Sequence, residues 1–92
     1  MANEKRNKAL QKYFVVMEND DHNKFDDVVL LLHKHARTSL VQGLFIASAV
    51  HTQGEYPVGM WHEEVASTIF ARLKEAGLSV KLEDADEWKN PE

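Results

Sequence analysis

Hydrophobic residues recur with two periods along this 92-residue chain, and the two periods predict three strands and three helices. Apolar runs or strict alternation, typical of strands, occupy residues 13–17, 56–61 and 78–82. Spacings of three and four residues, typical of amphipathic helices, fill the segments between them. The predicted order β-α-α-β-α-β is that of a single small α+β domain. A three-stranded antiparallel sheet with three helices packed on one face would bury every apolar stripe.

The same periodicity predicts which positions face the core. In the first helix they are Phe25, Val28, Val29, Leu32 and Ala36. In the second helix they are Leu40, Val41, Leu44, Phe45, Ser48 and Ala49. In the third helix they are Val65, Ala66, Ile69, Phe70 and Leu73. The strands contribute Tyr56, Val58, Met60, Leu78, Val80 and Leu82. Pro57 has no amide hydrogen to donate to a neighbouring strand. It therefore marks the second predicted strand as an edge strand, or lies at the start of that strand.

Polar and glycine residues mark the predicted helix ends. Asn23 is a good N-cap for the first helix, and Thr38 or Ser39 can cap the second. Gly54 and Gly77 end the second and third helices, because glycine tolerates the left-handed conformation found there. The regular pattern spans residues 12–84, which leaves an arm at 1–11 and an acidic tail at 85–92.

Composition narrows the function classes. The chain has no cysteine, which excludes disulfides, a thiol nucleophile and a thiolate metal site. A net charge of −4 disfavours nucleic acid as a partner, and no apolar stretch is long enough to span a membrane. The first residues lack a signal-peptide core, so we expect a cytoplasmic protein, with a plastid stroma left open. A domain this small has a thin core, which favours a monomeric binding module over an enzyme.

The residues that could carry catalysis do not combine into a site. Five histidines suggest a metal, but His33 and His35 are two apart on a helix and point in different directions. No His-x-x-x-His spacing is present, and no serine lies in a glycine elbow. We therefore expect no metal, no cofactor and no catalytic residues.

One polar cluster remains. Asn19, Asp20 and Asp21 crowd three short polar side chains into the predicted turn between a strand and a helix. Such a cluster can be a loop whose side chains bind its own backbone, or a binding site. His51, near the end of the second helix, is by itself more typical of a surface or capping histidine than of a ligand. The spacing alone leaves both alternatives open.

These residues belong to a longer pattern, which comprises KYFVVMENDDHNKFDDVVLLL at 12–32, AVHTQGEYPVG at 49–59 and EEVA at 63–66. This pattern resembles the ClpS family of Clp protease adaptors. The resemblance covers about residues 12–84. Its most specific parts are the Asn-Asp-Asp turn and the Ala-Val-His-x-Gln-Gly helix end. It implies a non-enzymatic N-recognin that binds proteins with a large hydrophobic first residue and delivers them to a Clp AAA+ unfoldase.

The resemblance also implies roles for individual residues. Asn19, Asp20 and His51 would accept hydrogen bonds from the free α-ammonium group, while Asp21 and Asn23 shape the turn and contact the first peptide bonds. The walls of the hydrophobic pocket would be Phe25, Val28, Ala47, Val50 and Leu78. Since a carboxylate in a turn contributes little to a core, we expect Asp20 to matter for binding rather than for folding.

Several positions depart from the family pattern. Phe25 and Ala47 stand where methionine is common; the first crowds the pocket mouth and the second opens its wall, which favours aromatic first residues over leucine. Glu64 would contact the N-terminal domain of an unfoldase of the ClpA or ClpC type. Ser67 and Ile69 replace a glutamate and a lysine of that docking motif, so the partner and its docking surface stay open.

A second resemblance gives an alternative. FARLKEAGLSVKLE at 70–83 is similar to the C-terminal domain of the ribosomal stalk protein, which has the same element order and binds partners through a helix surface.

Overall fold

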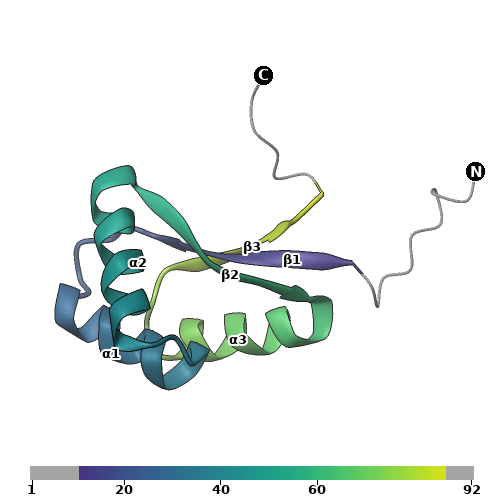
Figure 1. The fold of residues 1–92 in the computed structure, drawn as a ribbon, viewed down its shortest axis with the longest axis horizontal. Coiled ribbons are helices and arrows are strands. Elements are labelled where there is room, and N and C mark those ends of the chain that lie inside the picture. The colour runs from purple at the N-terminus through teal and green to yellow at the C-terminus, as the bar shows by residue number, and fades with distance from the viewer. Residues whose placement is uncertain (1–10, 87–92) are drawn as a thin grey trace, which may run out of the picture.

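The computed structural model describes residues 11–86, and within them the predicted order of elements is confirmed. The elements are β1 (Lys12–Glu18), α1 (Phe25–Ala36), α2 (Leu40–Gln53), β2 (Glu55–His62), α3 (Glu63–Glu75) and β3 (Val80–Asp84) (Figure 1). Residues 1–10 of the predicted arm and 87–92 of the predicted tail lie outside the described residues.

The three strands form one antiparallel sheet in the order β2-β1-β3. β1 lies in the centre, and its Val15 and Val16 are fully buried. β2 is therefore an edge strand, which confirms the interpretation of Pro57.

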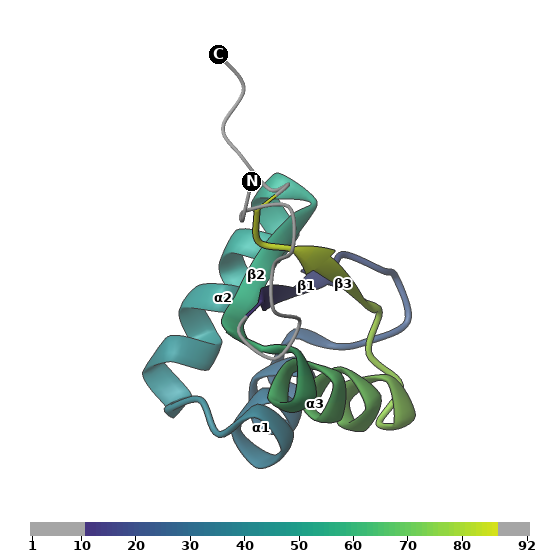
Figure 2. The same cartoon turned by 90° about the vertical axis from the view of Figure 1, so that its right-hand side faces the viewer.

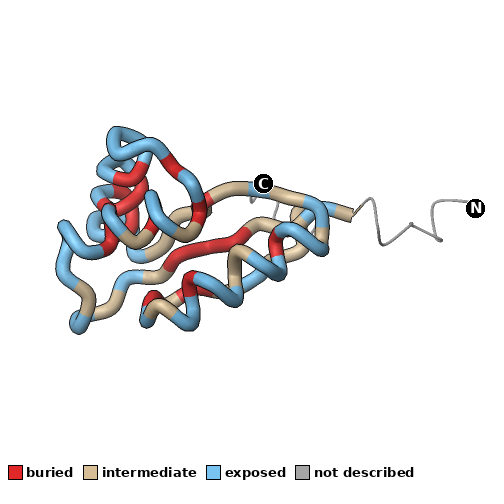
Figure 3. The backbone as a smooth tube through the Cα atoms, turned by 90° about the horizontal axis from the view of Figure 1, so that it is seen from below, coloured by how far each residue is buried: buried red, intermediate tan, exposed pale blue. Residues whose placement is uncertain are grey.

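The helices form a layer on one face of the sheet (Figure 2). α3 contacts all three strands, α2 contacts β2, and α1 packs against α2 and α3 as an outer helix. Buried positions follow the central strand and the inward sides of the helices (Figure 3). The core between the layers comprises Val15, Met17, Val28, Val29, Leu32, Ala36, Ile46, Ala47, Val50, Val58, Ala66, Leu73, Leu78 and Val80.

A β-bulge changes which side of β2 faces the core. Val15 pairs with Gly59 while Val16 pairs with Pro57, so Val58 is an extra residue in β2. One extra residue reverses the alternation beyond it. Trp61 consequently packs against the core. The inward position predicted for Met60 is wrong, because this side chain is 44% exposed.

The predicted inward face of α2 is wrong at five of its six residues, and only Ala49 is buried as predicted. Its large side chains are exposed, namely Leu40, Val41, Leu44 and Phe45, as is Ser48. The buried residues are Gly43, Ile46, Ala47, Ala49 and Val50. A Cβ atom on Gly43 would lie 3.3 Å from Cγ1 of Val29, so α1 and α2 approach each other through small residues. Because apolar residues surround the whole helix, their spacing does not identify which side is buried.

Helix ends agree with the sequence in α2 and α3 and differ in α1. The Ser39 hydroxyl accepts a hydrogen bond from the Gln42 amide, while Gly54 and Gly77 adopt φ values of 94° and 98°. The N-cap residue of α1 is Lys24, whose side chain makes no capping bond. The predicted capping role of Asn23 is wrong, because its side chain is used within the turn described below. Three further predicted inward residues, Phe25, Val65 and Leu82, are 43%, 48% and 37% exposed.

Candidate functional site: a pocket between the β1–α1 turn and α2

A pocket of about 370 Å³ opens between the β1–α1 turn, the first residues of α1 and the last turns of α2. Nine of the ten residues predicted to bind a peptide line it: Asn19, Asp20, Asp21, Asn23, Phe25, Val28, Ala47, Val50 and His51. The fold thus brings together two sequence segments about 25 residues apart. Leu78, the tenth residue, is buried in the core and does not line the pocket.

Two lining residues, Met17 and Glu18, were not predicted. Met17 is buried and belongs to the core cluster. The alternation along β1 contained a signal for it, since Met17 follows the inward-facing Val15 by two residues.

Two backbone hydrogen bonds fix the β1–α1 turn between its neighbours. The Glu18 amide donates to the Ser79 carbonyl at 2.8 Å, which ties the turn to the segment before β3. The Asn19 amide donates to the Gly54 carbonyl at 2.9 Å, on the opposite side. Because Gly54 ends α2 three residues after His51, this bond brings Asn19 to the helix end that carries His51.

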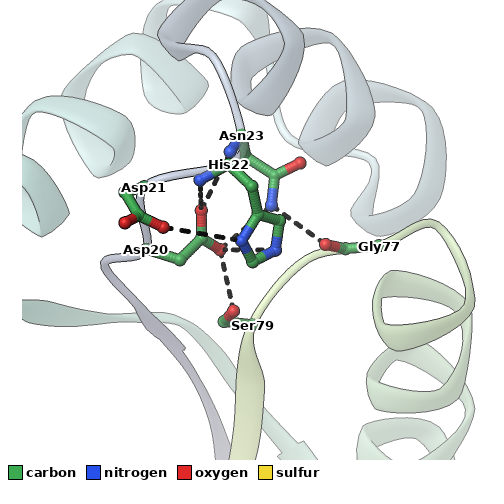
Figure 4. Close-up of polar contacts among 6 residues, drawn as sticks. All are labelled: Asp20, Asp21, His22, Asn23, Gly77 and Ser79. Atoms are coloured by element: carbon green, nitrogen blue, oxygen red, sulfur yellow. Dashed lines mark hydrogen bonds and ion pairs between the residues drawn. The ribbon is translucent and has the colours of Figure 1, made fainter.

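The Asp20 carboxylate is the centre of a hydrogen-bond network inside the turn (Figure 4). Its Oδ1 accepts from the backbone amides of His22 at 3.1 Å and Asn23 at 2.9 Å. Its Oδ2 accepts from Asn23 Nδ2 at 3.0 Å and from the Ser79 hydroxyl at 2.7 Å. A carboxylate has about four lone-pair sites, so four donors satisfy it. Its role in the structure is to hold the turn together, which differs from the expectation that Asp20 contributes little to folding.

The same contacts keep Asp20 ionised. Burial by itself would raise the pKa of this carboxyl group, whose side chain is only 11% exposed. The hydrogen bonds from Ser79, Asn23 and His22 outweigh that cost, and they lower the pKa from 3.8 to about 2. The pocket therefore carries this negative charge throughout the physiological pH range.

Asn23 extends the network to the loop that follows α3. Besides contacting Asp20, its Nδ2 donates to the Gly77 carbonyl at 2.9 Å. The side chain thereby connects the turn before α1 to the loop after α3. The sequence predicted a helix cap at this position, whereas the Asn23 side chain joins Asp20 to the Gly77 carbonyl.

Asp21 presents its carboxylate to solvent at the pocket. The side chain is fully exposed, and its one described contact is a distance of 3.9 Å from Oδ1 to Nδ1 of His22. His22 also lies 3.7 Å from Asp20, from Nε2 to Oδ2, and it is 66% exposed. In contrast to Asp20, Asp21 retains free lone pairs for a ligand.

The pocket has a polar end and an apolar end. Asn19, Asp21 and His51 are exposed side chains with oxygen or nitrogen acceptors at the polar end. Val28, Ala47 and Val50 are buried and form the apolar wall, and the more exposed Phe25 also lines it. Among residues 11–86, no lysine or arginine lines the pocket. Such a site favours a ligand that joins a cationic hydrogen-bond donor to an apolar group.

The described residues 11–86 contain no group of three histidine, aspartate or glutamate side chains arranged to hold a metal ion. None of the helices in this part of the chain has the length and apolar character needed to cross a membrane.

Glu64, the predicted unfoldase contact, lies far from the pocket along the chain, near the start of α3. It lines two neighbouring surface hollows. One is formed by the first turns of α3, and the other lies between α3, Trp61 and the end of α1. Ser67 lines the first hollow and Ile69 the second.

Comparisons with known proteins identify a family to which the chain is similar. The family model described as ATP-dependent Clp protease adaptor protein ClpS matches residues 8–81. The ATP-dependent Clp protease adapter proteins ClpS of Xanthomonas oryzae pv. oryzae and Xanthomonas axonopodis pv. citri are each 34% identical to the chain over 64 residues. These matches cover 70% of this chain, and the chain spans 60% of the length of the curated relatives.

A solved structure is also similar, that of Agrobacterium tumefaciens ClpS2 bound to L-phenylalaninamide. It superposes with a TM-score of 0.72 at 26% sequence identity, and the match covers 80% of this chain and 96% of that one. These matches favour the ClpS resemblance over the ribosomal-stalk alternative. The chain therefore belongs to the ClpS family, whose members are described as ATP-dependent Clp protease adaptor proteins.

Proposed function

We propose that the chain is an adaptor that captures proteins by a free α-amino group and a large hydrophobic first side chain, and delivers them to a Clp unfoldase. The observation that carries the proposal is the two-ended pocket. It places acceptor side chains without a cation at one end and an apolar wall at the other. A protein N-terminus that begins with a bulky apolar residue has the same two parts in the same order.

The polar end matches an α-ammonium group, which has three donors and no acceptor. Asn19 offers its side-chain carbonyl, Asp21 a carboxylate and neutral His51 a ring nitrogen. Charge-assisted hydrogen bonds of this kind contribute about 1.5–3 kcal/mol each where they are partly shielded from water.

We assign Asp20 a different part in recognition from the one that the resemblance implies. Its four hydrogen-bond partners are all within the protein, so it acts on the ligand through its charge and by positioning Asn19 and Asp21. Direct contact with the amine then belongs to Asn19, Asp21 and His51.

The apolar end accepts the first side chain. Burying a side chain the size of leucine or phenylalanine contributes about 1.5–3 kcal/mol. With the amine contacts, and after the entropy cost of association, this gives a dissociation constant in the micromolar range. Ala47 leaves room in the wall and Phe25 offers a ring at the mouth, so aromatic first residues are preferred. The ligand of the similar ClpS2 structure, L-phenylalaninamide, has this combination of groups.

Delivery needs a second surface. The start of α3, with Glu64, lies on another part of the molecule, so an adaptor can hold a substrate and contact an unfoldase of the ClpA or ClpC type at the same time.

The test is a panel of short peptides that differ only in the first residue, measured by calorimetry or fluorescence anisotropy. We expect Phe, Tyr and Trp peptides to bind more tightly than Leu, and a Ser peptide to bind at least tenfold more weakly. The control is the Phe peptide with an acetylated N-terminus, which should lose binding. Equal affinity for the acetylated and free peptides would refute recognition of the amine, and tighter binding of Leu than of all three aromatics would refute the aromatic preference.

A further inference from the structure

A second groove lies at the opposite end of α1 from the amine pocket. It is bounded by the end of α1, by Trp61 of β2 and by one side of α3, and its volume is about 590 Å³. α1 has 12 residues, so its two ends are separated by about 17 Å. α1 and α3 lie next to each other on this side of the molecule (Figure 2).

The floor of the groove is apolar. Trp61 and Ile69 pack against the core and leave part of their surface in the groove, and Ala36 is buried beside them. Val65, which the periodicity predicted to be buried, is 48% exposed here. The groove therefore exposes apolar surface beyond what the fold requires.

The rim is cationic, although the protein is acidic overall. Arg37 and Arg72 lie at the groove together with His35, against a single carboxylate from Glu64. Within residues 11–86 neither arginine takes part in an ion pair, whereas Lys81 on the sheet contacts three glutamates. A chain with a net charge of −4 thus keeps two unneutralised guanidinium groups beside an apolar floor.

Arg37 adopts a backbone conformation that arginine disfavours. Its φ of 60° and ψ of 29° are those of the left-handed region at the C-cap of α1, and among the described residues it is the one non-glycine residue with positive φ. Glycine is the usual residue at such a position. The Arg37 side chain forms no ion pair within residues 11–86, so the fold alone does not explain an arginine at this position.

We propose that this groove binds a partner segment that presents apolar side chains flanked by carboxylates. The apolar side chains would lie on Trp61 and Val65, and the carboxylates would pair with Arg37 and Arg72. A guanidinium group suits this partner because it binds a carboxylate through two parallel hydrogen bonds. The inference is independent of the amine pocket, because the groove needs no free N-terminus.

The proposal can be tested by NMR with two peptides that are acetylated and amidated, so that neither can enter the amine pocket. The acidic probe is acetyl-Gly-Glu-Leu-Leu-Glu-Gly-amide, and its counterpart has lysine in place of both glutamates. We expect the acidic peptide to shift the Trp61 indole and the Arg37 and Arg72 side-chain resonances with a dissociation constant in the millimolar range, and to bind more weakly at high salt. The lysine peptide should leave these resonances unchanged.

Two substitutions separate binding from folding. Arg37→Gly relieves the left-handed backbone, so it should raise Tm by about 4–8 °C. It should nevertheless lower the affinity for the acidic peptide about threefold, and Arg72→Gln should do the same. The expected effect is small because exposed charge pairs contribute little individually. Lys34→Gln is the matched control, since it removes the same charge from α1 outside the groove. All three variants should bind a free Phe peptide as tightly as the unmodified protein.

The proposal is overturned if the acidic peptide fails to shift the Trp61 resonance, if both peptides shift it equally, or if Arg37→Gly and Arg72→Gln leave the affinity unchanged. Shifts of the same resonances with rising protein concentration and no peptide would also overturn it, since they would identify a second copy of the chain as the occupant. Loss of Phe-peptide binding to the unmodified protein, with the groove result intact, would count against the proposed function alone.

Discussion

The Ser79 hydroxyl donates a hydrogen bond of 2.7 Å to Oδ2 of Asp20 and joins residues 59 positions apart in the sequence. The Asn19–Gly54 backbone bond holds the same turn from the side of α2. The polar end of the pocket is thus fixed by tertiary contacts on two sides, and its geometry depends on them as much as on the turn itself.

Removing the Ser79 hydroxyl tests this dependence. Ser79→Ala deletes a donor to a poorly exposed carboxylate, so we expect the free energy of unfolding to fall by about 1.5 kcal/mol. Urea unfolding at pH 7 measures the change. Ser48→Ala, on the exposed side of α2, is the control and should change stability by less than about 0.5 kcal/mol. Equal effects of the two substitutions would show that the Ser79–Asp20 bond is energetically unimportant.

The lowered pKa of Asp20 predicts a particular loss of stability in acid. The folded protein holds this carboxyl group at a pKa of about 2, below the value of 3.8 for an unstructured chain. The unfolded chain therefore takes up the proton first as the pH falls, and acid favours unfolding. The contribution, about 2 kcal/mol, is fully present above about pH 5 and is lost as the pH falls towards 2.

Urea unfolding of the unmodified protein and of Asp20→Asn, from pH 6 to pH 2, measures this contribution. Asp20→Asn should be less stable at pH 6 and should lose about 2 kcal/mol less than the unmodified protein over the range. Parallel stability curves for the two proteins would contradict the assignment of the acid sensitivity to Asp20.

Asp21 should affect binding without affecting folding. Its carboxylate is exposed and free to contact an ammonium group, so Asp21→Asn should weaken a Phe peptide about tenfold, equivalent to about 1.4 kcal/mol. Its free energy of unfolding should change by less than about 0.5 kcal/mol. Asp27→Asn removes the same charge from the exposed side of α1 and is the control. If Asp27→Asn weakens binding as much, the effect is one of net charge rather than of contact.

The sequence predicted the order of elements because the signals for it are local, namely alternation and helical spacing. The pocket residues were predicted from the family resemblance, since the short polar run at 19–21 by itself left a self-bonded loop and a binding site both open. Where the signal depended on three-dimensional context, the prediction was wrong. α2 carries apolar residues around its whole circumference, so its contacts with α1 through Gly43 and with β2 decide which side is buried.

Three further features required tertiary information. The extra residue Val58 in β2 is not visible in the alternation, and it exchanges the roles of Met60 and Trp61. Asn23 is a residue typical of caps, but the Gly77 carbonyl, 54 residues later, competes for its side chain. Likewise, no spacing in the sequence indicates that Ser79 would occupy Asp20 and leave Asp21 exposed.

The wall of the pocket should determine which first residue is preferred. Ala47→Met adds several methylene equivalents to a buried position that lines the pocket, so it should reduce the space for an aromatic ring. We expect the affinity for Phe and Trp peptides to fall at least fivefold and the affinity for a Leu peptide to change less than twofold, measured with the first-residue panel. Ser48→Met, one residue away and exposed, should leave the order of affinities unchanged. A uniform loss for all peptides would indicate a distorted helix rather than a smaller pocket.

The role of His51 as an acceptor predicts that its ring nitrogen contributes to peptide affinity. His51→Ala removes one acceptor for the ammonium group, so it should weaken binding of a Phe peptide about tenfold, equivalent to about 1.4 kcal/mol. Calorimetry at pH 7 measures the change.

His22 is the other histidine near the polar end, and it lies 3.7 Å from Asp20 and 3.9 Å from Asp21. It does not line the pocket, so His22→Ala is the matched control and should change the affinity for a Phe peptide less than twofold. Equal losses in the two variants would show that the ring nitrogen of His51 is not a specific acceptor for the ammonium group.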